Sequence, residues 1–156
     1  MMRSESAMLG FHREPVYGKG LFYDRGAIVG DALMKMKAFD VRPPSPMLKT
    51  ANFSGGNQQK IVLAREIERN PRILLVGQPT RGVDIGAIEF IHKRIVAQRD
   101  AGKAVLLVSV ELDEIFALSD RIIVLCGGRI TGERRPEETN PQDLGLLMAG
   151  VSDRAA

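Results

Sequence analysis

Residues 52–60 read NFSGGNQQK, a short turn that leads into an apolar-periodic segment. The adjacent glycines Gly55 and Gly56 allow the backbone to turn tightly and to come close to a ligand. Ser54 stands where a helix N-cap belongs, and its side-chain oxygen can accept a hydrogen bond from the first turn. The other amides of that turn point outward at the positive end of the helix dipole, which suits a phosphate. The stretch therefore predicts a helix start that is either an ordinary capped turn or an anion site.

The composition indicates a globular chain rather than a membrane-spanning or nucleic-acid-binding one. The chain has 156 residues, 44% hydrophobic and 26% charged, and a net charge of +3 from scattered basic residues. This balance does not favour nucleic acid as a partner. No apolar run reaches the roughly 18 residues of a membrane span, and the N-terminus has no signal-peptide apolar region. A single cysteine, Cys126, fits a reducing compartment. His12 lacks further ligand residues at suitable spacing, so no metal site is predicted.

Helices and strands are predicted to alternate after an N-terminal part, residues 1–23, that Pro15 and two glycines interrupt. From Asp24 an apolar stripe recurs at helical spacing, and prolines then make residues 42–46 an extended segment. The following elements are expected: helices over 57–69, 85–100, 111–118 and 141–148, strands over 73–76 and 104–108, and a hairpin of 121–126 with 129–132.

The two predicted strands, 73–76 and 104–108, are continuous apolar runs. Such runs are typical of parallel strands that are covered on both faces. Pro79 predicts an extended conformation for Gln78. Asp84 and Asn140 can each cap the helix that follows them. The alternation of strand and helix predicts an α/β layered fold.

The stretch SGGNQQK resembles the signature motif of ATP-binding cassette (ABC) proteins, usually written LSGGQ. Its form is similar to that in the second nucleotide-binding half of tandem ATPases that drive bacterial simple-sugar and nucleoside importers. The resemblance extends from about residue 7 to 150 and includes QPTRGVD at 78–84, SVELDE at 109–114 and SDR at 119–121. Within this family, the resemblance to nucleoside importers in particular is based on residues 78–82 and 86–92.

This resemblance implies a partial ABC-type ATPase domain, related to P-loop NTPases, with a mainly parallel sheet and helices around it. Residues 1–70 would be a helical-subdomain segment that ends in the signature helix. Residues 71–135 would form the α/β core with the Walker B, D-loop and switch positions, and residues 136–156 a C-terminal helix and tail.

The resemblance also implies a nucleotide site shared between two domains. Ser54, Gly55, Gly56 and Asn57 would contact ATP held by another ABC nucleotide-binding domain, and Asp84 would lie at the interface. ATP and Mg²⁺ would be held mainly by that partner, and this chain alone would bind neither tightly.

The chain departs from the family pattern at its catalytic positions. The phosphate loop G-x-x-x-x-G-K-[ST] is absent, and residues 18–20, GKG, have the wrong spacing for one. The Walker B aspartate and glutamate positions hold Gly77 and Gln78. A glutamine amide at this catalytic position can orient a water but cannot take its proton. The switch histidine position holds Val110. We therefore expect the chain alone to be inactive.

Two functions follow as hypotheses. In the first, the chain is an ATP-binding subunit, or a fragment of one, of an ABC importer for sugars or nucleosides. It would associate with transmembrane permease subunits at the cytoplasmic face of the inner membrane. In the second, the chain is a non-catalytic remnant or a docking module. A DNA-repair relative of the ABC ATPases is less favoured, because the sequence around the signature has the transporter form.

Overall fold

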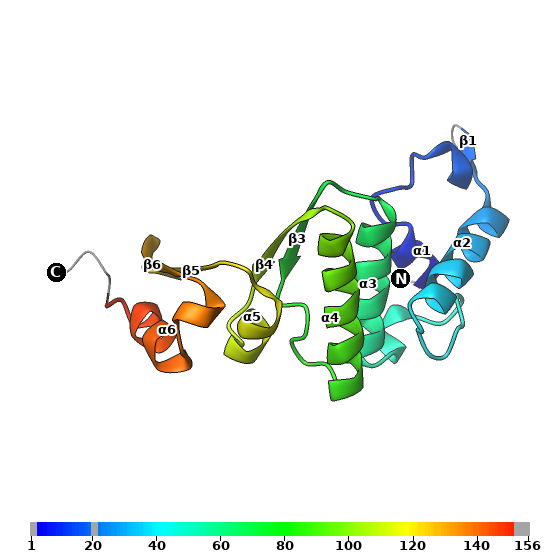
Figure 1. Ribbon diagram of the computed structural model, residues 1–156. Helices are drawn as coiled ribbons and strands as arrows, with labels where there is room; N and C mark the ends of the chain where they lie inside the picture. The colour runs from blue at the N-terminus through cyan, green and yellow to red at the C-terminus, as the bar shows by residue number, and fades with distance from the viewer. Residues whose placement is uncertain (1–2, 20–21, 152–156) are drawn as a thin grey trace. The chain divides into compact units, whose positions relative to one another are not determined.

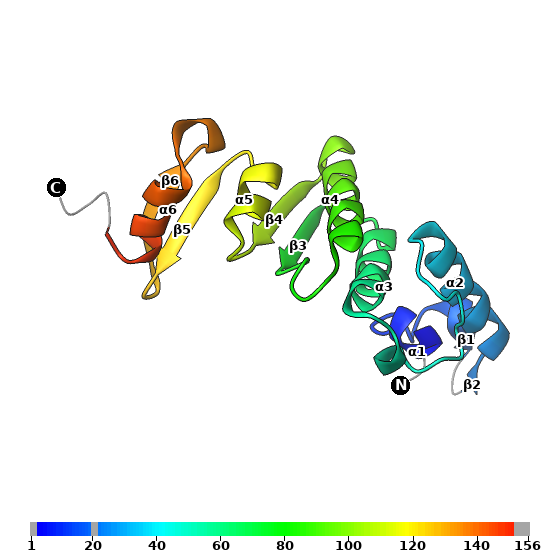
Figure 2. The same ribbon diagram turned by 90° about the horizontal axis from the view of Figure 1, so that it is seen from below.

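The computed structural model of the chain describes residues 3–19 and 22–151 (Figures 1 and 2). Its internal contacts divide the chain into two compact units, Met1–Leu106 and Leu107–Ala156. The expected three-part division at 70/71 and 135/136 remains a prediction. The two units, called the first and the second unit below, are described separately.

The first unit begins with a short helix and a small hairpin and continues into an alternation of helices and strands. β1 and β2 pair in antiparallel fashion. Of the GKG stretch at residues 18–20, Gly18 and Lys19 form β1, and Gly20 falls outside the described residues. α3 and α4 pack side by side (Figure 1). The elements are α1 (Arg3–Ala7), η1 (Pro15–Tyr17), β1 (Gly18–Lys19), β2 (Phe22–Tyr23), α2 (Arg25–Ala38), η2 (Thr50–Asn52), α3 (Gly55–Glu68), β3 (Ile73–Gly77) and α4 (Ile85–Asp100). The next strand, β4 (Ala104–Val108), begins in the first unit and ends in the second.

Side-chain caps start the three long helices where the sequence predicts them. Asp24 accepts a hydrogen bond from the amide of Ala27 at 3.0 Å, and Asp84 accepts one from Ala87 at 2.8 Å. Ser54 caps α3, which begins two residues earlier than expected. These caps satisfy amides that have no partner within the helix. α3 ends before Asn70, whose left-handed backbone (φ 49°) stops it as predicted.

The core of the first unit lies where the apolar faces of its helices meet. Ile28, Ala32 and Met36 of α2 are buried, which confirms the predicted stripe. The same stripe ends in Phe39, also buried, just beyond α2. Further buried apolar side chains come from α3 and α4: Ile61, Leu63, Ala64, Ala87, Ile91 and Ile95.

β3 and β4 form one two-stranded sheet, and α4 connects them. A strand–helix–strand connection of this length is the unit of a parallel sheet, so the predicted α/β architecture is confirmed. The prediction that both strands are covered on both faces is wrong. Leu74 and Val76 are buried, but Leu75 is 72% exposed, and Leu106 in β4 is 56% exposed. One face of β3 is therefore buried and the other is exposed.

Gln78 is not extended as predicted but left-handed, with φ 49°. The ring of Pro79 disfavours the right-handed helical region for Gln78, yet it leaves the left-handed region open. The carbonyl of Gln78 accepts the amide of Arg81 at 3.3 Å, so the chain reverses here into a turn. This turn brings the chain from the end of β3 to the start of α4.

The second unit contains the predicted hairpin and C-terminal helix. β5 (Ile122–Cys126) and β6 (Arg129–Arg134) are antiparallel and joined through Gly127 and Gly128. Both glycines have positive φ, 56° and 74°, which a tight hairpin turn of this kind requires. β6 runs two residues further than expected. The other elements are α5 (Leu112–Leu118), η3 (Pro136–Glu138) and α6 (Pro141–Met148).

One face of this hairpin packs against α6. Ile122 and Val124 of β5 meet Leu144 and Leu147 of α6 in a small buried cluster. Asn140 caps α6 as predicted, by accepting the amide of Asp143 at 2.9 Å. Among the described residues of the whole chain, no helix is long and apolar enough to cross a membrane.

Candidate functional site

The candidate site is built at the start of α3. Ser54 is exposed, and its hydroxyl oxygen accepts two hydrogen bonds from Asn57. One comes from the backbone amide at 3.4 Å and the other from the side-chain Nδ2 at 3.0 Å. Ser54 is therefore both a helix cap and an accessible polar group at the positive end of the helix dipole.

Gly55 and Gly56 are required by close packing rather than by backbone conformation, since both are helical residues of α3 and neither has a positive φ. A Cβ on Gly55 would lie 2.7 Å from the carbonyl oxygen of Gly82. A Cβ on Gly56 would lie 2.7 Å from Cβ of Ala87. Both distances are shorter than non-bonded carbon and oxygen atoms tolerate. The two glycines thus let the start of α3 lie directly against the turn after β3 and the start of α4.

Asp84 joins this group because of the same packing. Its side chain caps α4, and its Oδ2 lies 3.2 Å from the position that a Cβ on Gly56 would take. The turn that carries Asp84 is thereby held beside the residues that start α3. The structure brings Ser54, Gly56, Asn57 and Asp84 to one place.

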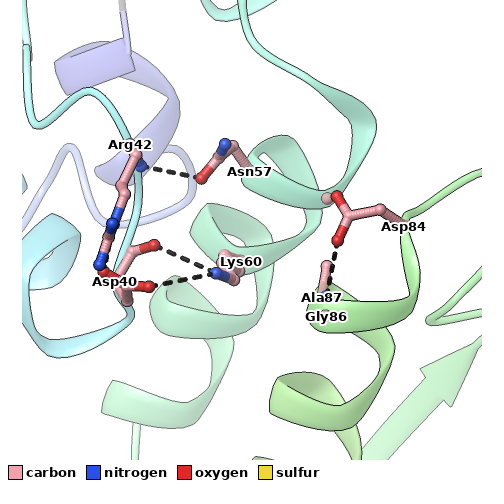
Figure 3. A pocket seen from close by; sticks show the side chains of 8 residues that line it. Asp40, Arg42, Asn57, Lys60, Asp84, Gly86 and Ala87 are labelled. Carbon is pink, nitrogen blue, oxygen red and sulfur yellow. Dashed lines mark hydrogen bonds and ion pairs between the residues drawn. The ribbon is translucent and has the colours of Figure 1, made fainter.

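A hollow of about 330 Å³ lies at this place (Figure 3). Side chains from three segments surround it: the residues just after α2, the first turns of α3, and the start of α4. They are Asp40, Arg42, Gly56, Asn57, Lys60, Asp84, Gly86 and Ala87. The sequence prediction missed Asp40, Arg42 and Lys60. Lys60 stands three residues after Asn57, so helical spacing alone could have placed it on the same face.

The charges around the hollow are largely paired. Arg42 Nε donates to Asp40 Oδ1 at 2.8 Å, and Lys60 Nζ donates to the backbone carbonyl of Asp40 at 3.1 Å. The hydrogen bond from Arg42 holds the pKa of the Asp40 carboxyl below its usual range, and the positive charges of Arg42 and Lys60 act in the same direction. Arg42 and Lys60 both pair with Asp40, and with Asp84 the lining residues carry two positive and two negative formal charges.

The remaining predicted positions are not among the residues that line this hollow. Gly77 ends β3 and is exposed, and Gln78 is partly buried, but neither lines the hollow. Val110 belongs to the second unit and is 61% exposed. Within residues 3–19 and 22–151 there is no group of three or more histidine, cysteine, aspartate or glutamate side chains arranged to hold a metal ion.

Comparisons with known proteins agree with this fold. The chain is 49% identical to a guanosine import ATP-binding protein, NupO of Bacillus subtilis, over 94% of its own length and 28% of the relative. It is 49% identical to a nucleoside import ATP-binding protein, NupA of Lactococcus lactis, over 96% of its length and 30% of the relative. The chain therefore spans less than a third of the curated relatives it matches. No protein-family model matches the sequence.

Solved structures give the same class of fold. A dimeric bacterial ABC transporter cassette aligns with a TM-score of 0.68 and 25% identity over 87% of this chain and 57% of that one. An ATP-binding subunit of an ABC transporter aligns with a TM-score of 0.70 and 19% identity over 96% of this chain and 62% of that one. The chain belongs to the ABC ATPases and has the fold of part of their cassette. Within that class it is similar to the ATP-binding proteins of nucleoside and sugar importers.

Proposed function

We propose that the chain supplies Ser54, Gly55, Gly56 and Asn57 to an ATP site that another ABC nucleotide-binding domain completes. The observation that carries this proposal is the exposed Ser54 at the start of α3, beside amides whose helix dipole favours a phosphate. Packing of Gly55 and Gly56 against Gly82 and Ala87 holds that start in place. Asp84 lies beside it and would meet the partner domain.

The partner would hold most of the nucleotide. The chain has no phosphate loop of the family's form, and Gly77 offers no side chain to ligate Mg²⁺. Gln78 can orient a water but cannot act as a general base at neutral pH. ATP and Mg²⁺ would therefore be bound mainly by the partner, and this chain would close over the terminal phosphate. The hydroxyl of Ser54 and the first amides of α3 are the groups that would reach it.

The transport role follows from the likeness to importer proteins. The relatives NupO and NupA are named for guanosine and nucleoside import, and others of the group for sugars. We propose a nucleoside importer, with sugars as the alternative substrate class. The chain would work with transmembrane permease subunits at the cytoplasmic face of the membrane.

A Ser54→Arg substitution tests the proposed ATP contact. In the native assembly, isolated through a tag on this chain and reconstituted in vesicles, we expect MgATP hydrolysis coupled to transport to fall by about 100-fold. The arginine side chain would fill the space that the phosphate needs and would remove the hydroxyl donor. Gln59→Arg, five residues after Ser54 on α3, adds the same side chain away from Ser54 and is expected to keep the rate. Unchanged hydrolysis in Ser54→Arg would contradict the proposed role.

The second candidate is a non-catalytic docking module or remnant. The observation that favours it is the exposed apolar face of β3, where Ile73 and Leu75 are 64% and 72% exposed. Apolar surface of this kind marks either an interface or an aggregation hazard. In a docking module, Gly77 and Gln78 would stand in place of the Walker B aspartate and glutamate because the chain had lost its catalytic role.

The size of the native product separates the two candidates. An antibody raised against residues 57–70 would be used on a blot of source cells. A band much larger than 17.1 kDa is expected if the chain is part of a tandem ATPase. A band at 17.1 kDa with no ATP turnover by the purified product would favour the docking module.

A further inference from the structure

The side-chain amide of Asn57 connects Ser54 to the connector, which is the segment of residues 39–49 between α2 and η2. Oδ1 of Asn57 accepts the backbone amide of Arg42 at 2.9 Å (Figure 3). Nδ2 of Asn57 donates to the hydroxyl oxygen of Ser54 at 3.0 Å. A backbone N–H can only donate, so Arg42 determines which end of the amide group faces the connector. The donor end is thereby directed at Ser54.

These contacts use both acceptor positions of the Ser54 hydroxyl. A serine hydroxyl has one hydrogen to donate and two lone pairs that accept. The backbone amide of Asn57 and its Nδ2 supply two donors to this oxygen, at 3.4 and 3.0 Å. Only the hydroxyl hydrogen is left to form a further hydrogen bond, and it can reach a group outside the chain because Ser54 is exposed. Ser54 is therefore prepared to donate to an acceptor outside the chain, such as a phosphate oxygen, and poorly prepared to accept.

We propose that Asn57 is a positioning residue that commits the Ser54 hydroxyl to donate toward the terminal phosphate. This inference rests on the proposed ATP contact and refines it, because Asn57 acts through Ser54 rather than by touching the nucleotide itself. The backbone amide of Arg42 is the fixed point of the arrangement. The path runs from Arg42 N–H to Asn57, from Asn57 to Ser54, and from Ser54 to the phosphate oxygen.

Two long cations hold the connector where Asn57 needs it. Lys60 of α3 donates to the carbonyl of Asp40 in the connector at 3.1 Å, and Arg94 of α4 donates to the carbonyl of Ala38, the last residue of α2 before the connector. Together with Arg42, three alternate residues of this backbone are bonded to side chains of α3 and α4. Lys60 and Arg94 also lie over the ring of Phe90, at 4.7 and 5.1 Å from its centroid. The position of Arg42 therefore follows from the packing of α3 and α4, not from a free loop.

Asn57→Asp tests the inference because it keeps the shape and removes the donor. The carboxylate would accept the Ser54 hydrogen for itself and turn it away from the phosphate. In the tagged native assembly we expect MgATP hydrolysis to fall by about 10- to 100-fold, as in Ser54→Ala. The double variant Ser54→Ala/Asn57→Asp is expected to be no slower than Ser54→Ala, since Asn57 acts only through that hydroxyl. Asn57→Ala, which adds no charge, is expected to lose about 10-fold and to lose nothing further in the Ser54→Ala background.

Gln59→Glu controls for the added charge. It lies about 200° around α3 from Asn57 and is expected to keep the rate of the unmodified assembly. A normal rate in Asn57→Asp and Asn57→Ala would overturn the inference while leaving the ATP contact intact, provided that Ser54→Ala is slow. Independent effects, with the double variant slower by the product of the two losses, would also overturn it. A normal rate in Ser54→Ala would instead remove the proposed ATP contact on which the inference depends.

Discussion

Replacing Gly56 by valine is expected to lower the free energy of unfolding of the first unit by about 3 kcal/mol, the upper end of what overpacking costs. A Cβ at this position would lie 2.7 Å from Cβ of Ala87 and 3.2 Å from Oδ2 of Asp84. Neither neighbour is the free end of a flexible side chain, since Ala87 is fixed to α4 and Asp84 caps that helix. The start of α3 must therefore move away from α4, which also displaces Ser54. Urea unfolding, followed by amide hydrogen exchange in α3 and α4, measures the change.

A second pair of variants identifies the contact responsible. Gly56→Ala is expected to cost about 2 kcal/mol, and adding Ala87→Gly is expected to return about 1 kcal/mol of it by removing the opposing Cβ. Gly30→Ala is the matched control, because a Cβ on Gly30 in α2 meets nothing within 4 Å. It should stabilise the unit by about 0.5–1 kcal/mol through helix propensity. Equal effects of Gly56→Ala and Gly30→Ala would show that the close contact with α4 carries no strain.

Local signals in the sequence were enough to predict most element boundaries. Ser54, Asp84 and Asn140 cap their helices as expected, because an N-cap depends on a side chain and amides only two or three residues away. Asp24, predicted only to start its helix, caps it in the same way. The turn at Gly127 is local in the same way. Patterns of this range are complete within a few residues, so no knowledge of the tertiary fold is needed to interpret them.

The errors concern properties that depend on distant parts of the chain. The apolar run of β3 resembles a strand covered on both faces, yet Leu75 is exposed, because coverage depends on which elements pack there. The left-handed backbone of Gln78 follows from the turn that leads to α4, whereas the neighbouring proline restricts only part of the allowed region.

The candidate site shows the same division. Ser54, Gly55, Gly56 and Asn57 could be predicted because they form one motif in sequence. The link from Asn57 to Arg42 spans 15 residues and depends on how the connector folds back. The packing reason for Gly55 and Gly56 likewise lies in α4 and in the turn before it, which no local pattern around the glycines specifies. A motif thus gives the identity of the groups, and only the fold gives their orientation.

A buried ion pair also escaped the sequence prediction and carries a second large effect. Lys35 of α2 is 4% exposed and bonds to Asp31 at 2.5 Å and to Glu68 of α3 at 3.0 Å. Tyr17 donates to the same Asp31 carboxylate at 2.7 Å. This group joins η1, α2 and the end of α3, so it fixes the helix that carries Ser54 at its other end.

Lys35→Met is expected to destabilise the first unit by about 3 kcal/mol at neutral pH, because Asp31, whose side chain is only 19% exposed, would lose its cation, and the more exposed Glu68 would lose it too. Methionine keeps most of the apolar stem, so packing contributes little to the loss. Lys37→Met is the matched control: Lys37 is exposed on the same helix, and the change should stay within about 0.5 kcal/mol. A loss no larger than that of the control would mean that the ion pair adds no net stability.

The pH dependence of this stability has a definite sign. Burial alone would lower the pKa of Lys35, but its hydrogen bonds to Asp31 and Glu68 outweigh burial and raise the pKa to about 12. A cation with a raised folded-state pKa stabilises fully below its unfolded pKa of about 10.4, and that stability disappears as the pH rises through about 12. Burial and the hydrogen bond to Asp31 likewise raise the pKa of Tyr17, which acts in the same direction. The difference in unfolding free energy between the unmodified chain and Lys35→Met should therefore stay constant from pH 7 to about 10 and decline above it. If this difference in unfolding free energy instead decreased as the pH was lowered from 8 to 5, a titrating carboxylate would be responsible.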